Sequence, residues 1–342
     1  MTSIIRNLSQ WIITSPNKEL LEEIWIIDYH SHVWNILKRD PSQLYDVEKT
    51  FPIDIRTLGW NFWKFKAPWK IMEALMHTNF VDDILKKSWK NRNESATLKT
   101  FYESLEDSFT YKTVILPIPP YQTFDDLLEV QKHNDKMILF TWVDFKSLVN
   151  WVDIKIQESF DKLEIQFKND INNWAKWLKI HPIIQWVSAN SDIVNDVVTL
   201  WTDISKWLPI IFHTWVTEYC MRDEICNNHK PEYGEIKYFI DLAKNQTKAN
   251  IVIGHSGLFQ VDEVAEYLSK FDNVVVDTSF QWKEKINLLL NKFWENRLMY
   301  ASDWPYWDRV PAINVMLDSL NWNRELITKI MRDNALYSMK MK

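Results

Sequence analysis

Short apolar runs alternate with longer amphipathic stretches along most of the 342-residue chain. Runs rich in β-branched and aromatic residues are typical of buried strands, and helical stretches between them are typical of βα units around a parallel sheet. Eight such runs suffice to close a barrel. The sequence therefore predicts an α/β fold, a (β/α)8 TIM barrel that forms a single domain over residues 1–342. The expected strands are residues 24–28, 112–117, 137–141, 178–181, 209–213, 250–254, 273–277 and 297–301.

Helix signals lie between several of these runs. Ser15 followed by Pro16 is typical of a helix start, because serine caps free amide groups and proline fits the first turn. Apolar residues recur at helical spacing in residues 154–176, 191–205 and 233–244. We expect these stretches to form helices of the outer layer.

The connection after the first expected strand, residues 33–111, is much longer than the few residues usual for such a loop. Its helical patterning and many aromatic residues favour a helical cap over the carboxyl end of the barrel, where it would shape a substrate pocket. A peripheral subdomain, or a contact between the two chains of a homodimer, explains the same length equally well. Residues 214–232 form a shorter polar excursion, which we expect to supply a second wall.

Side chains that bind metals follow four of the expected strands. His30 and His32 follow the first, and because residues two apart on a strand face the same side, both imidazoles can face one point. In a parallel barrel the carboxyl ends of all strands converge on one axis. His213, His255 and Asp303 end later runs and are expected to meet the pair there. Imidazole and carboxylate ligands together suit zinc or a similar divalent ion, whereas calcium and magnesium prefer mainly oxygen ligands.

Each of these residues alone has an ordinary structural explanation. A single histidine at a strand end more often makes a capping or buried hydrogen bond than binds a metal. The His30 and His32 pair, joined by three further residues in matching positions, favours one shared site. Asp28 lies just before the pair, and we expect it to orient a ligand or to cap the strand.

Two polar residues in the fourth expected strand are candidates for substrate contact. Lys179 and His181 share one face of that strand, and Arg309 is a third candidate. A carbamylated lysine between two metals is an alternative role for Lys179, but the remaining ligands already complete a site for one ion. The expected cofactor is therefore one divalent metal ion, with zinc as the first choice.

The composition argues against several classes of protein. Hydrophobic residues make up 46% of the chain and charged residues 25%, as in an ordinary folded domain. The net charge of −6 is spread along the chain without a basic block, so we expect no nucleic-acid partner. No run reaches the length of a membrane helix and the N-terminus lacks a signal-peptide core, so we expect no membrane association and a cytoplasmic location. Cys220 and Cys226 do not make a disulfide framework, and we expect reduced thiols.

Glycine is scarce and tryptophan is abundant, with 4 glycines against 20 tryptophans. Average usage of about 7% would give roughly two dozen glycines in a chain of this length. Tryptophan stands where turns usually have glycine, although positive φ and close backbone approach penalise a bulky side chain. The positions that show this are Trp34, Trp142, Trp186, Trp207, Trp215 and Trp307.

Our hypothesis is that most of the tryptophans, but not Trp304, are glycines in the natural protein. A UGA codon that is reassigned to glycine would appear as tryptophan if the gene were translated with the wrong code. A protein that is naturally rich in tryptophan, with an unusual core, is the alternative.

Several motifs together resemble the amidohydrolase superfamily, specifically its amidohydrolase-2 branch of metal-dependent hydrolases related to aminocarboxymuconate semialdehyde decarboxylase. The resemblance covers residues 24–337. The matching segments are Ile27-Asp28-Tyr29-His30-Ser31-His32, Leu178-Lys179-Ile180-His181-Pro182, Phe212-His213-Thr214-Trp215, Gly254-His255-Ser256-Gly257, Val276-Asp277-Thr278-Ser279, Ala301-Ser302-Asp303-Trp304-Pro305 and Arg332-Asp333-Asn334-Ala335. Trp215 departs from the branch, which has glycine at that position.

The resemblance implies a role for each matching residue. His30, His32, His213 and Asp303 would hold one metal. His255 would act on the substrate or on the activated water, and Asp303 would take the proton of that water while remaining a ligand. As written, Trp215 beside His213 and Trp34 beside His32 would crowd the site.

The expected function is metal-dependent hydrolysis of a small organic molecule, an ester, lactone or amide, by a water that the metal activates. In this mechanism the metal and His255 stabilise the developing oxyanion. A nonoxidative decarboxylase, a lyase that acts on an aromatic or enoic acid at the same centre, is the second choice, because a fold and a metal do not determine the reaction. A non-catalytic metal-binding protein is the third.

Overall fold

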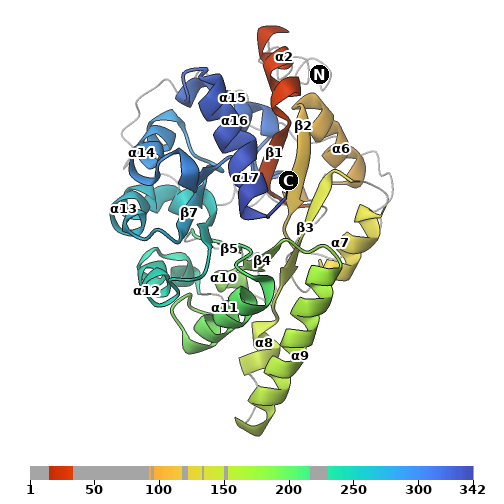
Figure 1. Cartoon of the computed structure of the whole chain (residues 1–342), viewed down its shortest axis with the longest axis vertical. Helices are drawn as coiled ribbons and strands as arrows, with labels where there is room; N and C mark the ends of the chain where they lie inside the picture. The colour runs from red at the N-terminus through yellow and green to blue at the C-terminus, as the bar shows by residue number, and fades with distance from the viewer. Residues whose placement is uncertain are drawn as a thin grey trace, which may run out of the picture.

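Eight parallel strands follow one another in chain order around a barrel (Figure 1). This computed structural model describes residues 15–33, 92–93, 96–117, 122–132, 135–149, 153–215 and 230–341. The strands are β1 (Ile26–Ser31), β2 (Thr110–Ile115), β3 (Met137–Trp142), β4 (Trp177–Ile180), β5 (Ile210–Phe212), β6 (Ile251–Ile253), β7 (Val274–Asp277) and β8 (Leu298–Met299). All eight lie within a few residues of the expected positions, so the predicted α/β barrel is confirmed.

Hydrogen bonds between β1 and the segment after β8 complete the barrel. The amide of Tyr29 donates to the carbonyl oxygen of Tyr300 at 3.1 Å. The amide of Asp303 donates to the carbonyl oxygen of His30 at 2.7 Å. Ser31 also forms an isolated parallel bridge with Trp304. The seam of the barrel therefore joins two of the segments that carry predicted metal ligands.

Helices surround the barrel in the order expected for βα units (Figure 1). The expected helices at 154–176, 191–205 and 233–244 appear as α9, α11 and α12. The α-helices are α2 (Ser15–Ile24), α6 (Leu98–Asp107), α7 (Phe124–Gln131), α8 (Phe145–Val149), α9 (Asp153–Asn172), α10 (Pro182–Gln185), α11 (Asp192–Ser205), α12 (Lys237–Asn245), α13 (Val261–Tyr267), α14 (Lys283–Phe293), α15 (Arg309–Ser319), α16 (Arg324–Thr328) and α17 (Asn334–Ser338). Shorter turns are η4 (Pro231–Gly234), η5 (Gly254–Gln260), η6 (Leu268–Lys270), η7 (Glu295–Arg297) and the π-helical η8 (Lys329–Asp333).

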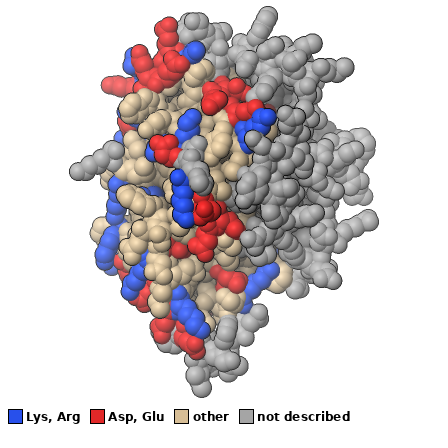
Figure 2. All heavy atoms as spheres, turned by 90° about the vertical axis from the view of Figure 1, so that its right-hand side faces the viewer, with Lys and Arg blue, Asp and Glu red and all other residues tan. Residues whose placement is uncertain are grey.

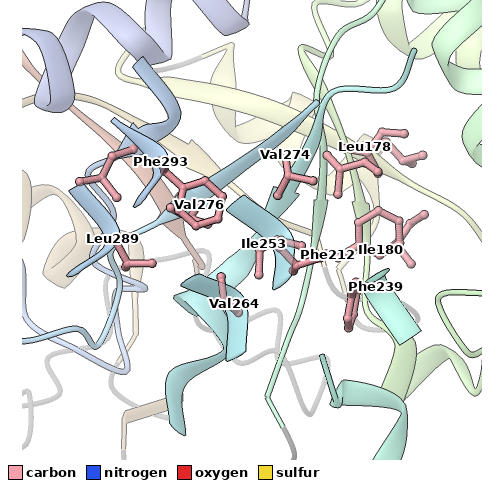
Figure 3. Close-up of a cluster of buried hydrophobic side chains, with 14 of the residues drawn as sticks. Leu178, Ile180, Phe212, Phe239, Ile253, Val264, Val274, Val276, Leu289 and Phe293 are labelled. Atoms are coloured by element: carbon pink, nitrogen blue, oxygen red, sulfur yellow. The ribbon is translucent and has the colours of Figure 1, made fainter. Parts of the chain in front are cut away.

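The largest hydrophobic cluster lies between the strands and the surrounding helices (Figure 3). On β4, Leu178 and Ile180 belong to this outer cluster, whereas Trp177 belongs to the cluster inside the barrel. Successive side chains on a strand face opposite sides, so Lys179 lies on the inner side, one layer beyond Trp177. Burial of the apolar outer face thus places Lys179 inside the barrel.

The C-terminal helix α17 packs against the residues inside the barrel. Ala335 and Met339 belong to the inner cluster together with Ile27 and Tyr29. The hydroxyl groups of Tyr29 and Ser338 are 2.6 Å apart and form a buried hydrogen bond. The end of the chain therefore contributes to the barrel core, at the level of residues that precede the predicted metal ligand His30 on β1.

Six tryptophans of the described residues have positive φ, a region that favours glycine. They are Trp25, Trp174, Trp186, Trp207, Trp294 and Trp322. Trp294, at φ 60° and ψ 169°, occupies a region that essentially only glycine adopts. Trp174 and Trp294 are each 68% exposed, so little burial offsets the backbone strain.

The tryptophans without positive φ differ among themselves. Trp304 is 1% exposed and packs against Phe101 and the Arg309 guanidinium. Trp142, Trp215 and Trp307 have no positive φ, so the backbone gives no reason for glycine there. The glycine hypothesis is thus supported at Trp186 and Trp207 and at four positions not singled out from the sequence, while Trp34 lies outside the described residues.

Other expectations fall on parts of the chain that are not described. Most of the expected cap at 33–111 is among them, although α6 forms its last part; the middle of the 214–232 excursion and both cysteines are also outside. Acidic and basic side chains are interspersed over the described part of the face in Figure 2. None of the described helices combines the length and apolar character needed to cross a membrane.

Candidate metal centre

Three predicted metal ligands come together at the carboxyl end of β1. The Nε2 atoms of His30 and His32 lie 3.3 Å and 3.2 Å from Oδ1 of Asp303. The three ligand atoms all lie within 4.8 Å of one another, and the residues that carry them are buried. Side chains separated by more than 270 positions in the sequence therefore face one small space.

Hydrogen bonds on the far side of each ring determine which nitrogen faces that space. Nδ1 of His30 lies 2.8 Å from Oδ2 of Asp277, and Nδ1 of His32 lies 3.1 Å from the carbonyl oxygen of Leu116. A carboxylate and a carbonyl oxygen only accept, so both Nδ1 atoms donate and both Nε2 atoms carry a lone pair in the neutral rings. Such contacts are typical of metal-binding histidines.

The three converging atoms are therefore all acceptors. Nε2 of His30 and Oδ1 of Asp303 are buried and have no hydrogen-bond partner among the described residues. Buried acceptors that face one another are unfavourable unless a cation lies between them. Two imidazoles and one carboxylate are ligands that zinc and related divalent ions prefer, so the residues fit the predicted metal.

His213, the fourth predicted ligand, lies beside this group rather than within it. Its Nδ1 is 3.1 Å from Nε2 of His255, and its ring stacks on that of His181 with centroids 4.0 Å apart. The compact group consists of His30, His32 and Asp303, so the role of His213 as a ligand stays a prediction.

His255 sits next to the group and is held in an unusual backbone conformation. Its ring stacks on that of His30 with centroids 4.7 Å apart. Its φ of 58° begins a run of four residues with positive φ that ends at Leu258. The amide of His255 donates to Oδ1 of Asp277 at 2.8 Å, and Nε2 of Gln281 donates to its carbonyl oxygen at 2.7 Å. Such strain persists only where the surrounding contacts determine the conformation, and it is common at functional sites.

Burial shifts the protonation equilibria of the site. Desolvation, with the nearby positive charge of Lys179, lowers the pKa of His30 well below its usual value, and His181, His213 and His255 shift in the same direction. Neutral imidazole is the form that binds a metal. Burial also lowers the pKa of Lys179 to about 8, although Asp303 and Asp277 oppose the shift.

Among the predicted substrate contacts, Lys179 stands out. Its Nζ is buried and has no hydrogen-bond partner within the described residues. Every group that affects its pKa electrostatically is a carboxylate of the site. His181 is also buried beside the site, where its Nδ1 accepts a hydrogen bond from the amide of Ile184.

Arg309 has a different environment. Its Nε forms an ion pair with Oδ2 of Asp28 at 2.9 Å, and it donates further hydrogen bonds to Ser31 and Ser104. Asp28 in turn accepts from the amide of Ser302 at 2.9 Å. Arg309 and Asp28 therefore tie β1 to the segment that carries Asp303, and these contacts give no support to Arg309 as a substrate contact.

No role was predicted from the sequence for Asp277 or Ser279. Asp277 ends β7 and contacts both His30 and His255, while Oγ of Ser279 lies 2.7 Å from Nδ1 of His255. Their position in the sequence could have indicated a role in the site, because both lie at the end of an expected strand, as the predicted ligands do.

Part of the chain matches a known protein family. Residues 225–336 match a family model described as Amidohydrolase. A comparison with curated protein sequences gives no match.

Solved structures share the fold at low sequence identity. A probable 2-pyrone-4,6-dicarboxylic acid hydrolase from Acinetobacter baumannii, with citric acid bound, is 12% identical, and the match covers 93% of this chain and 100% of that one at a TM-score of 0.55. A 5-carboxyvanillate decarboxylase from Novosphingobium aromaticivorans, with bound manganese, is 14% identical. The match covers 92% of this chain and 97% of that one, at a TM-score of 0.57. An uncharacterised TIM-barrel protein from Bordetella bronchiseptica is 12% identical. The match covers 92% of this chain and 99% of that one, at a TM-score of 0.60.

These neighbours include both hydrolases and decarboxylases, so the shared fold does not select one reaction. The chain is a TIM barrel whose resemblance to the amidohydrolase-2 branch is confirmed by the sequence match over residues 225–336.

Proposed function

We propose that the protein is a metal-dependent hydrolase that acts on an ester, lactone or amide carbonyl of a small organic molecule. The observation that carries the proposal is the set of three buried acceptor atoms from His30, His32 and Asp303 that face one another. A divalent ion held there, with zinc as our first choice, would lower the pKa of a water molecule and polarise a carbonyl oxygen.

The residues around the ligands have complementary roles in this proposal. Asp303 takes a proton from the attacking water, because its Oδ1 is an acceptor beside both histidines. His255 lies against His30 and handles a proton at the reacting group. Lys179 binds a negatively charged group of the substrate, since its buried ammonium group lacks a hydrogen-bond partner among the described residues.

Lys179 also favours the second candidate, a nonoxidative decarboxylase. A buried cation beside the centre suits a carboxylate, whether that carboxylate is an anchor or the group that leaves. The decarboxylase neighbour with bound manganese has the same fold. A third candidate, a metal-binding protein without catalytic activity, has the same ligands and predicts no turnover.

One panel of assays separates the three. The full-length protein, loaded with zinc or manganese, is given 2-pyrone-4,6-dicarboxylate, p-nitrophenyl acetate and 5-carboxyvanillate, and both acid production and CO2 release are measured. We expect acid production without CO2, and a loss of about 100-fold or more in Asp303→Asn. The exposed Asp262→Asn is the matched control and should retain the activity. CO2 release alone would favour the lyase, and activity that Asp303→Asn leaves intact would contradict both enzymes.

Other predictions from the sequence stand beside this proposal. We infer a cytoplasmic protein with a small-molecule substrate and without nucleic-acid or membrane partners, and a homodimer remains open. Acidic and basic side chains are interspersed on the described part of the face in Figure 2, which supports the inference that nucleic acid is not a partner.

A further inference from the structure

Both carboxylate oxygens of Asp277 contact the site. Oδ2 accepts from Nδ1 of His30 at 2.8 Å. Oδ1 accepts from the amides of His255 and Ser279 at 2.8 Å and 3.0 Å, and from the hydroxyl of Ser279 at 2.6 Å. The side chain is fully buried, so these contacts are shielded from water. An oxygen that receives three hydrogen bonds acts as an acceptor toward all of them.

The hydroxyl of Ser279 passes this constraint on to His255. A hydroxyl has one hydrogen, and here it is donated to Asp277. The same oxygen lies 2.7 Å from Nδ1 of His255, so it must accept there and the ring nitrogen must donate. The neutral ring of His255 therefore carries its hydrogen on Nδ1 and a lone pair on Nε2.

The chain of contacts continues to His213. Nε2 of His255 and Nδ1 of His213 are 3.1 Å apart. Since Nε2 of His255 is the acceptor, Nδ1 of His213 is the donor, and its hydrogen leaves a lone pair on Nε2 of His213. A free lone pair on a neutral ring is what His213 needs if it is to serve as a metal ligand.

We propose that Asp277 is a positioning residue that sets the tautomers of three histidines, directly for His30 and through Ser279 for His255 and His213. The proposal rests on the metal site of the proposed function and deepens it, because one carboxylate prepares two predicted metal ligands and one predicted catalytic residue. The neutral ring of His255 has its only hydrogen on Nδ1, so its Nε2 acts as an acceptor and has no hydrogen to donate.

Nitrogen NMR of the full-length, metal-free protein labelled on the histidine rings tests this at neutral pH. The three rings are assigned by His30→Gln, His213→Gln and His255→Gln. We expect hydrogen on Nδ1 in all three rings. In Ser279→Ala, His255 and His213 should lose this single tautomer, while His30 should keep it because its bond to Asp277 is direct. Ser279→Thr should restore the wild-type pattern.

Ser256→Ala is the matched control, since the hydroxyl of Ser256 donates to the main-chain oxygen of Asp277 and not to its carboxylate. A second readout is the affinity for zinc alone, which Ser279→Ala should lower about 10-fold or more and Ser256→Ala should leave within twofold. A His255 ring with hydrogen on Nε2 in the wild type, or tautomers that Ser279→Ala leaves unchanged, would overturn the proposal. These readouts need no substrate, so absence of hydrolysis with the expected tautomers would count against the proposed function only.

Discussion

Single residues decide whether the chain as written folds without strain. Trp294 adopts a conformation that essentially only glycine adopts, and its side chain is 68% exposed. Trp294→Gly should therefore raise the free energy of unfolding by about 1–3 kcal/mol, measured by urea denaturation. Trp304→Gly is the matched comparison and should lower it by about 3–5 kcal/mol, because Trp304 is buried against Phe101. Equal effects of the two substitutions would contradict the glycine hypothesis, as would UGG codons at the positions with positive φ.

The residues of the centre were predictable only where they occur at strand ends. His30, His32, His255 and Asp303 each follow an apolar run, and the convergence of strands in a barrel brings them together. The contact of His30 with Asp277 joins residues 247 positions apart, and no local pattern indicates which nitrogen it uses. Arg309 stays a predicted substrate contact, although its guanidinium forms a buried ion pair with Asp28 that no pattern in the sequence indicates.

At the level of elements, the strands were predictable because most of their residues are buried and the apolar runs are nearly continuous, although Tyr111 on β2 is exposed. The ends of the strands were predicted less accurately. β8 spans only Leu298–Met299, and β1 continues to Ser31, three residues beyond its expected end. An irregular register between Asp28 and Ser31 lies in this extension. Such a bulge redirects side chains, and the alternation of apolar residues does not reveal it.

The short C-terminal helix α17 gives a prediction of its own. Met339, at its end, is fully buried in the inner cluster, whereas Tyr337 is 88% exposed. Met339→Ala should lower the free energy of unfolding by about 2–5 kcal/mol. Tyr337→Ala, in the same helix, should change it by less than about 0.5 kcal/mol. Thermal and urea unfolding would measure both, and a Met339→Ala protein as stable as the wild type would show that the end of the chain is not part of the core.

For the whole molecule, the buried histidines predict how stability depends on pH. Burial holds the pKa values of His30, His181, His213 and His255 well below those in the unfolded chain. Below about pH 6.5 the unfolded state therefore binds more protons, and stability is lost as the pH falls. Burial raises the pKa values of Asp277 and Asp303, which has the opposite sign and offsets part of the loss.

We expect the midpoint temperature of thermal unfolding of the metal-free protein to decrease as the pH is lowered from about 7.5 to about 5.5. Zinc at the higher pH should raise the midpoint temperature. At a zinc concentration 100 times the Kd, the free energy of unfolding should increase by about 2.7 kcal/mol. A midpoint that rises as the pH falls over this range would show that the carboxyl groups outweigh the histidines. A zinc effect that Asp303→Ala leaves unchanged would place the ion elsewhere.

We propose that one divalent ion binds at the carboxyl end of β1, and anomalous diffraction would locate the ion and its ligands together. Crystals of the protein grown with zinc would be measured on both sides of the zinc absorption edge. We expect one anomalous peak about 2.0–2.2 Å from Nε2 of His30, Nε2 of His32 and an oxygen of Asp303. A metal-loaded crystal with no peak at these three residues, or with its peak elsewhere in the chain, would show that the ion does not bind there.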